Sequence, residues 1–185
     1  MKKKAYKILC VGGGSIGARH LKNLLLLGFN SISVSDPRKK RLADLKREMK
    51  IPVYTTAKEA IEKERPNVVL ISAPTSDHIS LANLALDENC HTFIEKPLSH
   101  TPAGIDELIK KTRHQRRTVM VACNFLFDKG YQALRHAVHS ETFGSPLYAR
   151  IAGGYYLPSA RSKTPYKKVY AATRAGGGVI LDSGS

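Results

Sequence analysis

The stretch KILCVGGGSIGARH, residues 7–20, decides the fold of this 185-residue chain. An apolar run typical of a strand leads into the pattern G-x-G-x-x-G, and a helical pattern follows directly. In that context the first glycine permits a tight turn, the second lets a pyrophosphate approach the backbone, and the third lets helix and strand pack closely. The helix N-terminus adds amide donors for phosphates. The stretch favours a dinucleotide site over a purely structural turn, with contacts expected from Gly12, Gly14, Ser15, Ile16 and Gly17.

Short apolar runs alternate with helical patterns through residue 124. Runs that are apolar on both faces are typical of strands buried in a parallel sheet. They occupy residues 7–13, 31–36, 67–73, 91–95 and 118–123, with a weaker run at 51–54. Helical patterns lie at 16–28, 38–50 and 101–115. Strand–helix alternation with short links predicts an α/β fold, a Rossmann doubly wound parallel sheet with right-handed crossovers.

Several positions inside these helical patterns give expectations that a structure tests directly. Thr101 is expected to cap the third helix, and Pro102 to be its first helical residue. The first helix places on one face Ile16, His20, Leu24 and Leu27, and it is expected to end at Gly28. The second helix has an apolar stripe formed by Leu42, Leu45 and Met49.

The pattern changes after Asn124. A helix is expected over residues 128–144 and a strand over 146–154, before a polar, tyrosine-rich segment at 155–175. About 60 residues do not easily close an independent α/β domain. The sequence therefore predicts a dinucleotide-binding domain over residues 1–124 and a partial C-terminal substrate or oligomerisation domain over 125–185.

Asp36 ends the second strand at the distance from the glycines where a carboxylate hydrogen-bonds the adenosine ribose. A carboxylate there favours NAD, because a 2′-phosphate would meet a negative charge. Arg38 and the basic residues that follow it favour NADP instead, since an arginine nearby accommodates that phosphate. NAD is the favoured cofactor, with NADP left open. The other role for Asp36, a helix cap, is compatible with ribose binding.

Two further segments leave strands at the edge of the sheet where ligands bind in such folds. In SAPTSDHI, residues 72–79, the expected cofactor contacts are Pro74, Thr75 and His78, although a surface histidine near a helix start is the alternative for His78. In EKP, residues 95–97, a lysine beside a nicotinamide is placed to position a substrate hydroxyl. An ordinary surface lysine is the alternative reading of Lys96.

Composition limits the class of protein further. An apolar fraction of 42% suits a globular chain, and a net charge of +15 favours anionic partners. No nucleic-acid reading motif accompanies that charge, so nucleic acid is an unlikely partner. Three cysteines have no spacing that suggests a metal site, and Cys10 and Cys123 are expected to be buried free thiols. The apolar runs are too short for a signal peptide or a membrane span, so a cytoplasmic location is expected.

The segments VGGGSIGARH, APTSDHISLANLAL, EKPLS and GGGVILDSGS, in this order, resemble the Gfo/Idh/MocA oxidoreductases, the relatives of glucose–fructose oxidoreductase and inositol dehydrogenase. The resemblance covers essentially the whole chain. It implies a Rossmann domain followed by the start of an α+β open-sheet C-terminal domain. It also implies nicotinamide-dependent oxidation or reduction at a ring carbon of a sugar, nucleotide sugar or cyclitol, and a homo-oligomer for the full-length form.

The resemblance also implies roles for particular residues. Lys96 corresponds to the family's catalytic lysine, beside both nicotinamide and substrate. Glu95 orients the loop and is expected, like Lys96, to contact the cofactor. The Lys96–Pro97 link is cis in relatives. Asp182 matches an aspartate that pairs with a general-base histidine four residues further on, and the chain ends just before that position. A fragment, or a non-catalytic NAD(P)-binding protein, is therefore the alternative to a complete enzyme.

The segment before the triple glycine resembles a subgroup that acts on nucleotide sugars and nonulosonic sugars. Its aromatic and basic residues suit contacts to a phosphate or carboxylate on a substrate. An ordinary surface loop is the alternative. The expected substrate contacts, besides Lys96 and Asp182, are Tyr156, Arg161, Tyr166 and Arg174.

Overall fold

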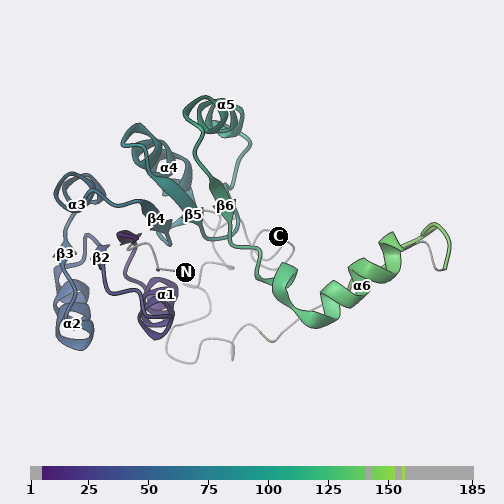
Figure 1. The fold of residues 1–185 in the computed structure, drawn as a ribbon, viewed down its shortest axis with the longest axis horizontal. Helices are drawn as coiled ribbons and strands as arrows, with labels where there is room; N and C mark the ends of the chain where they lie inside the picture. Colours follow the sequence, from purple (N-terminus) through teal and green to yellow (C-terminus); the bar gives the residue numbers. More distant parts are fainter. Residues whose placement is uncertain (1–5, 141–142, 153–155, 157–185) are drawn as a thin grey trace.

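The computed structural model describes residues 6–140, 143–152 and 156 (Figure 1). Six strands of the described part form one parallel sheet in the order β3-β2-β1-β4-β5-β6, which confirms the doubly wound sheet. The strands are β1 (Ile8–Val11), β2 (Ile32–Ser35), β3 (Val53–Tyr54), β4 (Val68–Ile71), β5 (His91–Ile94) and β6 (Val119–Val121). The α-helices are α1 (Ser15–Leu26), α2 (Lys39–Met49), α3 (Ala57–Glu64), α4 (His78–Asp87), α5 (Ile105–Gln115) and α6 (Lys129–His139). Short 3₁₀ turns are η1 (Thr75–Asp77) and η2 (Asn124–Phe127).

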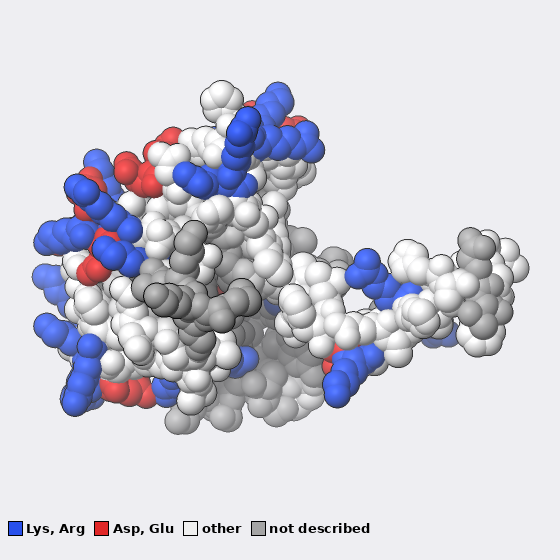
Figure 2. Space-filling view, viewed as in Figure 1, with Lys and Arg blue, Asp and Glu red and all other residues white. Residues whose placement is uncertain are grey.

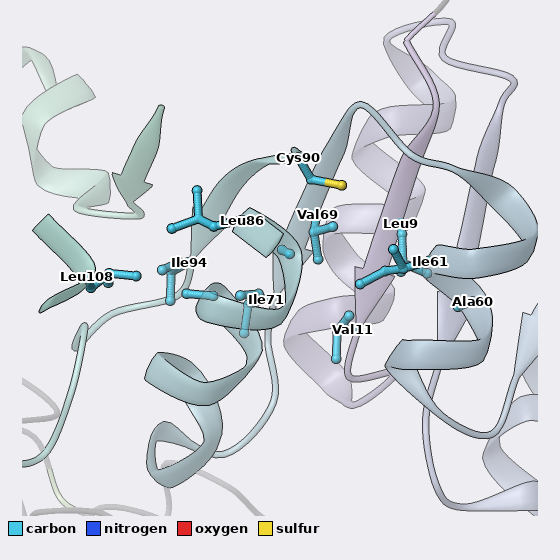
Figure 3. Packing of buried hydrophobic residues seen from close by; sticks show 12 residues of the cluster. Leu9, Val11, Ala60, Ile61, Val69, Ile71, Leu86, Cys90, Ile94 and Leu108 are labelled. Atoms are coloured by element: carbon cyan, nitrogen blue, oxygen red, sulfur yellow. The ribbon is translucent and has the colours of Figure 1, made fainter. Parts of the chain in front are cut away.

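Two hydrophobic clusters cover the two faces of this sheet. One joins side chains of β1, β4 and β5 to α3, α4 and α5, and Figure 3 shows Ile71 and Ile94 of the sheet among its helical partners. The other joins β1 and β2 to α1 and α2, where Leu21 and Leu45 are fully buried. Burial on both faces explains why these strands are almost continuously apolar in the sequence.

The buried face of α1 differs from the predicted one. Its buried residues are Gly17, Ala18 and Leu21, while Leu27 caps the helix and is 63% exposed. Small residues let the helix approach the sheet closely, so the inner face consists of Gly17 and Ala18 beside a single large side chain, Leu21. The predicted end is confirmed, because Gly28 follows the cap with a φ of +82°.

The predicted start of α5 is wrong. The helix begins at Ile105 and not near Thr101, with Gly104 as the capping residue at a φ of +78°. The Ile105 amide donates to the carbonyl of Pro102 at 3.2 Å, so residues 102–105 form a turn at the start of the helix. A left-handed glycine cannot lie inside an α-helix, and for that reason the proline does not serve as the first helical residue.

Beyond β6 the chain leaves the sheet. Figure 1 shows α6 extending away from it, and all but one of its residues are exposed. Asp128 caps α6 by accepting the amides of Gly130 and Tyr131 at 2.8 and 3.2 Å. The described residues 146–152 form no strand, contrary to prediction. A strand needs a paired neighbour, and in the described part no strand lies beside this segment. Within the described ranges, no helix is long and apolar enough to cross a membrane.

Candidate functional site

The strands end in register at one edge of the sheet. Val11 is paired with Ile71, and Ile71 with Ile94. The amides of the residues that follow continue the ladder, because Ser72 donates to Val11 and Glu95 donates to Ile71, each at 2.8 Å. The loops after β1, β4 and β5 therefore leave adjacent, fixed positions at the carboxyl edge, where ligands bind in open α/β sheets.

The geometry of the loop after β1 explains why glycines occupy it. Gly12 has a φ of +97°, and a Cβ on it would lie 2.6 Å from the Ser72 carbonyl oxygen. A Cβ on Gly17 would lie 1.9 Å from the Gly12 carbonyl oxygen. At Gly14, by contrast, the nearest neighbour of such an atom is an Arg38 nitrogen at 3.8 Å, an ordinary contact distance, so a Cβ fits there. Together with the N-terminus of α1, it forms a backbone cradle that fits a pyrophosphate.

Ser72 and Cys10 support the glycine loop from beneath. The Ser72 hydroxyl donates to the Gly12 carbonyl oxygen at 2.8 Å, and the Cys10 sulfur lies 3.6 Å from that hydroxyl. Burial raises the pKa of the Cys10 thiol to about 12, so Cys10 remains a neutral packing group. Cys10 is buried as predicted, whereas Cys123 is only partly buried. Sequence reasoning did not single out Ser72, although its position directly after β4 was the available signal.

Asp36 lies at the end of β2 with its side chain 2% exposed. Its carboxylate accepts from the Gly13 amide at 2.8 Å and the Arg38 amide at 2.9 Å. It also accepts from Arg38 Nε at 2.8 Å and Nη2 at 2.7 Å. Burial by itself raises the pKa of Asp36, but the hydrogen bonds from Arg38 and Gly13 outweigh it and hold the pKa below 3.8. Asp36 is therefore ionised at neutral pH. The N-cap position of α2, the other role considered for Asp36, is occupied by Arg38.

Asp36→Asn is expected to lower the free energy of unfolding by about 2 kcal/mol at pH 7, because hydrogen bonds to a charged group are lost. Because the folded pKa of Asp36 lies below 3.8, its contribution is complete above that pH and disappears as the pH falls through the folded pKa. Urea unfolding should show the difference between wild type and variant constant from pH 7 to pH 5 and smaller at pH 3. Asp44→Asn, at an exposed pair with Arg47, is the control with little effect. A difference that grows on acidification would contradict this.

A cleft of about 700 Å³ opens beside the glycine loop. It contains five of the predicted cofactor residues, namely Gly12, Gly14, Asp36, Arg38 and Pro74. Ser15 is exposed in the first turn of α1, Ile16 is half-buried, and Thr75 is buried. Side chains that sequence reasoning missed also line the cleft, among them Thr55, Asp77, Ser80 and Leu81. They come from the ends of β3 and η1 and from α4, so the rule that ligands bind at the carboxyl edge was the signal that could have found them.

His78 is not a surface residue, because it is 1% exposed. Its Nδ1 lies 3.0 Å from the carbonyl oxygen of Pro97, and its Nε2 lies 3.0 Å from that of Ala73. Both ring nitrogens are therefore occupied by backbone, and the ring is not among the groups that line the cleft. His78 joins the loop after β4 to the loop after β5. The predicted direct contact between His78 and a cofactor would need a ring nitrogen, and in this arrangement both already face backbone carbonyl oxygens.

The loop after β5 is anchored to α1. Glu95 Oε1 lies 2.6 Å from His20 Nε2, and Glu95 Oε2 accepts from the Lys96 amide at 3.3 Å. Burial raises the pKa of Glu95, but the hydrogen bond and charge of His20 and the Lys96 amide lower it below 4.5 overall. The Lys96–Pro97 bond is cis, as the family resemblance implied. Lys96 is half-buried beyond β5 and is not among the residues that line the cleft.

His20 was placed on a helix face by its spacing, but its partner could not be read from spacing. Its ring packs edge-on against Phe93 with the ring centroids 5.9 Å apart, and it contacts Glu95 across 75 residues of sequence. The expected substrate residue Tyr156 is 74% exposed. The remaining ones lie outside the described residues; they are Arg161, Tyr166, Arg174 and Asp182.

The basic charge is spread over the outer helices. Figure 2 shows lysine and arginine along the periphery formed by α2, α3 and α5, with acidic side chains among them. Some form exposed pairs, such as Lys22 with Glu48 at 2.6 Å. In the part of the chain that the structure describes, no group of three His, Cys, Asp or Glu side chains is arranged to hold a metal ion.

The fold, glycine cradle and buried carboxylate define the class of Rossmann domains that bind a dinucleotide. The sequence model of the GFO_IDH_MocA family, described as an oxidoreductase family with an NAD-binding Rossmann fold, matches residues 6–123. That match covers more than half of the chain, and the chain belongs to this family.

Relatives of this chain include dehydrogenases of cyclitols. Myo-inositol 2-dehydrogenase of Thermotoga maritima is 30% identical over 178 residues, which are 95% of this chain and 51% of the relative. Inositol 2-dehydrogenase/D-chiro-inositol 3-dehydrogenase of Halalkalibacterium halodurans is 29% identical over 77% of this chain and 42% of the relative. The chain thus spans about half the length of these curated relatives.

A solved structure gives the same fold. Scyllo-inositol dehydrogenase of Lactobacillus casei, with bound NAD(H) and scyllo-inositol, superposes with a TM-score of 0.70 at 20% identity. The superposition covers 76% of this chain and 43% of that one. At this identity the likeness concerns the fold, and it agrees with the topology described above.

Proposed function

We propose that this chain is the cofactor-binding part of an NAD-dependent dehydrogenase that oxidises a ring hydroxyl of a cyclitol or sugar. The observation that carries the proposal is the position of Lys96. Its strand, β5, adjoins β4, whose following residue Ser72 lines the dinucleotide cleft. The inositol dehydrogenases among the relatives support the substrate class. A nucleotide sugar is a further substrate class that this proposal includes.

The chain has residues suited to both parts of such a reaction, the transfer of hydride to the cofactor and the loss of a proton from the substrate. Oxidation removes a hydride from the ring carbon and a proton from its hydroxyl, and bound NAD supplies the hydride acceptor. Gly12 and Gly14 would hold its pyrophosphate and Asp36 its ribose. The Lys96 ammonium would donate a hydrogen bond to the substrate oxygen and stabilise the negative charge that develops as the proton leaves. We propose that Asp182 takes part in removing that proton.

Glu95 and His20 have a positioning role in this proposal. Both flanks of the reactive loop are fixed, since Glu95 contacts His20 of α1 and the Pro97 carbonyl contacts His78 of α4. The N-terminus of α1 also forms the phosphate cradle. One helix therefore connects the cofactor site to the loop that carries Lys96.

His20→Ala is expected to lower turnover by about tenfold to a hundredfold, because a hydrogen bond to the ionised Glu95 is lost and Lys96 is held less well. The affinity for NADH should change much less. His20→Gln, which offers an amide donor in place of Nε2, should restore part of the turnover. Steady-state kinetics and an NADH titration would separate the two quantities. An equal loss of NADH affinity and turnover, without rescue by glutamine, would mean that His20 serves folding alone.

The full-length gene product and a deuterium-labelled substrate test the proposed reaction. A panel of inositols, sugars and nucleotide sugars is incubated with NAD, and the active compound is then prepared with deuterium at its oxidised carbon. NADH one mass unit heavier, with a carbonyl product, is the expected result. Binding of NADH without reduction of NAD by any compound would favour the alternative of a non-catalytic NAD-binding protein.

We also propose that the boundary between the two domains lies at residues 124 and 125 and that the full-length protein forms a homo-oligomer. Supporting the boundary, β6 ends at Val121 and the apolar side chains of η2 are at least half exposed, including Phe125 at 50% and Phe127 at 67%. Such side chains are normally covered by other parts of a protein or by a partner.

A further inference from the structure

The first turn of α4 lies between the dinucleotide cleft and the loop after β5. The side of this turn that lines the cleft consists of Asp77, Ser80 and Leu81. Its other side contacts the loop at two points. His78 lies 3.0 Å from the carbonyl oxygen of Pro97, and a methyl carbon of Ile79 lies 3.0 Å from the Cβ position of Gly104, where the loop ends. One helical turn therefore contacts both the cofactor site and the reactive loop.

Within this turn, the ring of His78 joins the wall of the cleft to the loop directly. Its Nε2 lies 3.0 Å from the carbonyl oxygen of Ala73, a residue that lines the cleft. Its Nδ1 lies equally far from the carbonyl oxygen of Pro97, the residue that follows Lys96. The ring is buried, so neither nitrogen is available to solvent in place of these partners. A single side chain thus spans from the cofactor site to the residue next to Lys96.

The position of this ring depends on both loops at once. A histidine ring with one proton donates to one of the two oxygens, and a ring with both protons donates to each. In either state the ring is packed between the two carbonyl groups, and closely packed interiors transmit displacements. Restricting the Ala73 carbonyl therefore restricts the ring of His78, and the ring in turn restricts Pro97.

We propose that His78 is a positioning residue that couples occupancy of the dinucleotide cleft to the conformation of the loop carrying Lys96. A ligand in the cleft holds the wall at Ala73, His78 transmits this to Pro97, and the loop becomes ordered before any substrate binds. This role rests on the proposed function, in which Lys96 contacts the substrate. The coupling itself is measured without substrate, so failure of the proposed reaction would leave that measurement unaffected.

ADP-ribose tests the coupling, because it has the pyrophosphate and both riboses of NAD but no nicotinamide to reach Lys96. Amide hydrogen exchange is followed in the full-length protein with and without saturating ADP-ribose, in peptides that cover residues 72–80 and 93–101. In wild type, exchange is expected to slow in both peptides, by about fivefold or more in the second, the lower end of the range for coupled sites. Slower exchange in the first peptide alone would overturn the proposal.

Two substitutions of His78 each keep one of its contacts. Asparagine places an amide nitrogen near the position of Nδ1 and so retains the contact with Pro97, whereas glutamine places one near Nε2 and retains the contact with Ala73. In both His78→Asn and His78→Gln, ADP-ribose should still slow exchange in the first peptide but no longer in the second. His114→Gln, at an exposed histidine of α5, is the control that should behave as wild type. Wild-type protection of the second peptide in both His78 variants would overturn the proposal, as would loss of protection in both peptides together, which would show that His78 serves the cleft alone.

Discussion

Gly17→Ala is expected to prevent the formation of a stable, NADH-binding domain. The added Cβ would lie 1.9 Å from the Gly12 carbonyl oxygen and 2.7 Å from the Ser72 hydroxyl. The carbonyl cannot move aside easily, because it accepts a hydrogen bond from that hydroxyl. Helix α1 would have to shift away from β1, which separates the phosphate cradle from the sheet. We expect the free energy of unfolding to fall by about 3 kcal/mol or more.

A second glycine of the same loop provides the control. Gly14 has a φ of −63°, which alanine adopts readily, and a Cβ on it meets no atom closer than 3.8 Å. Gly14→Ala should therefore keep the stability of wild type while the new methyl group blocks the phosphate cradle and weakens NADH binding. Urea unfolding and NADH titration of both variants separate the two effects. A Gly17→Ala protein with wild-type stability would show that helix and strand do not need this close approach.

The elements that the sequence predicted well are those that local patterns determine. The apolar runs predicted the strands around Cys10 and Val34 because both faces of those strands are buried. The glycine spacing predicted the loop, since Gly12 and Gly17 each occupy a place that excludes a Cβ. Asp36 was predicted from its position after β2. Each of these inferences needed only the residues of one strand–turn–helix unit.

The inferences that failed depended on distant parts of the chain. Nothing near Thr101 shows that Gly104 adopts a left-handed conformation against Ile79 of α4, 3.0 Å from its Cβ position. The pattern at 146–152 is apolar enough for a strand, but a strand forms only beside another. His78 was predicted to contact the cofactor, with a surface position as the alternative, because spacing does not show that the sheet order brings the Ala73 and Pro97 carbonyl oxygens to its ring.

In the candidate site, too, local sequence identified the residues but not their distant partners. Sequence identified Lys96 and Asp36 as groups that carry chemistry, but not what each of them contacts. The partner of Glu95 is on α1, and the number of hydrogen bonds that Asp36 accepts depends on side-chain geometry. The cofactor class follows from the motif and the family.

Lys96→Met is expected to lower turnover by about 10²–10⁴-fold while NADH still binds, because methionine has a similar length but cannot donate a proton or a hydrogen bond to the substrate oxygen. The contacts that fix the loop should survive, since they come from Glu95, Pro97 and His78. Lys111→Met, at an ion pair with Asp87 on the outer helices, is the matched control and should retain full turnover.

The central claim is that Lys96 is the catalytic residue of an NAD-dependent dehydrogenase, and one paired measurement tests it most directly. The turnover number and the NADH dissociation constant of Lys96→Met are determined in the full-length protein with the compound that the substrate panel identifies. We predict turnover at least about a hundredfold below wild type, with an NADH constant within about threefold of it. Wild-type turnover in this variant would contradict the account.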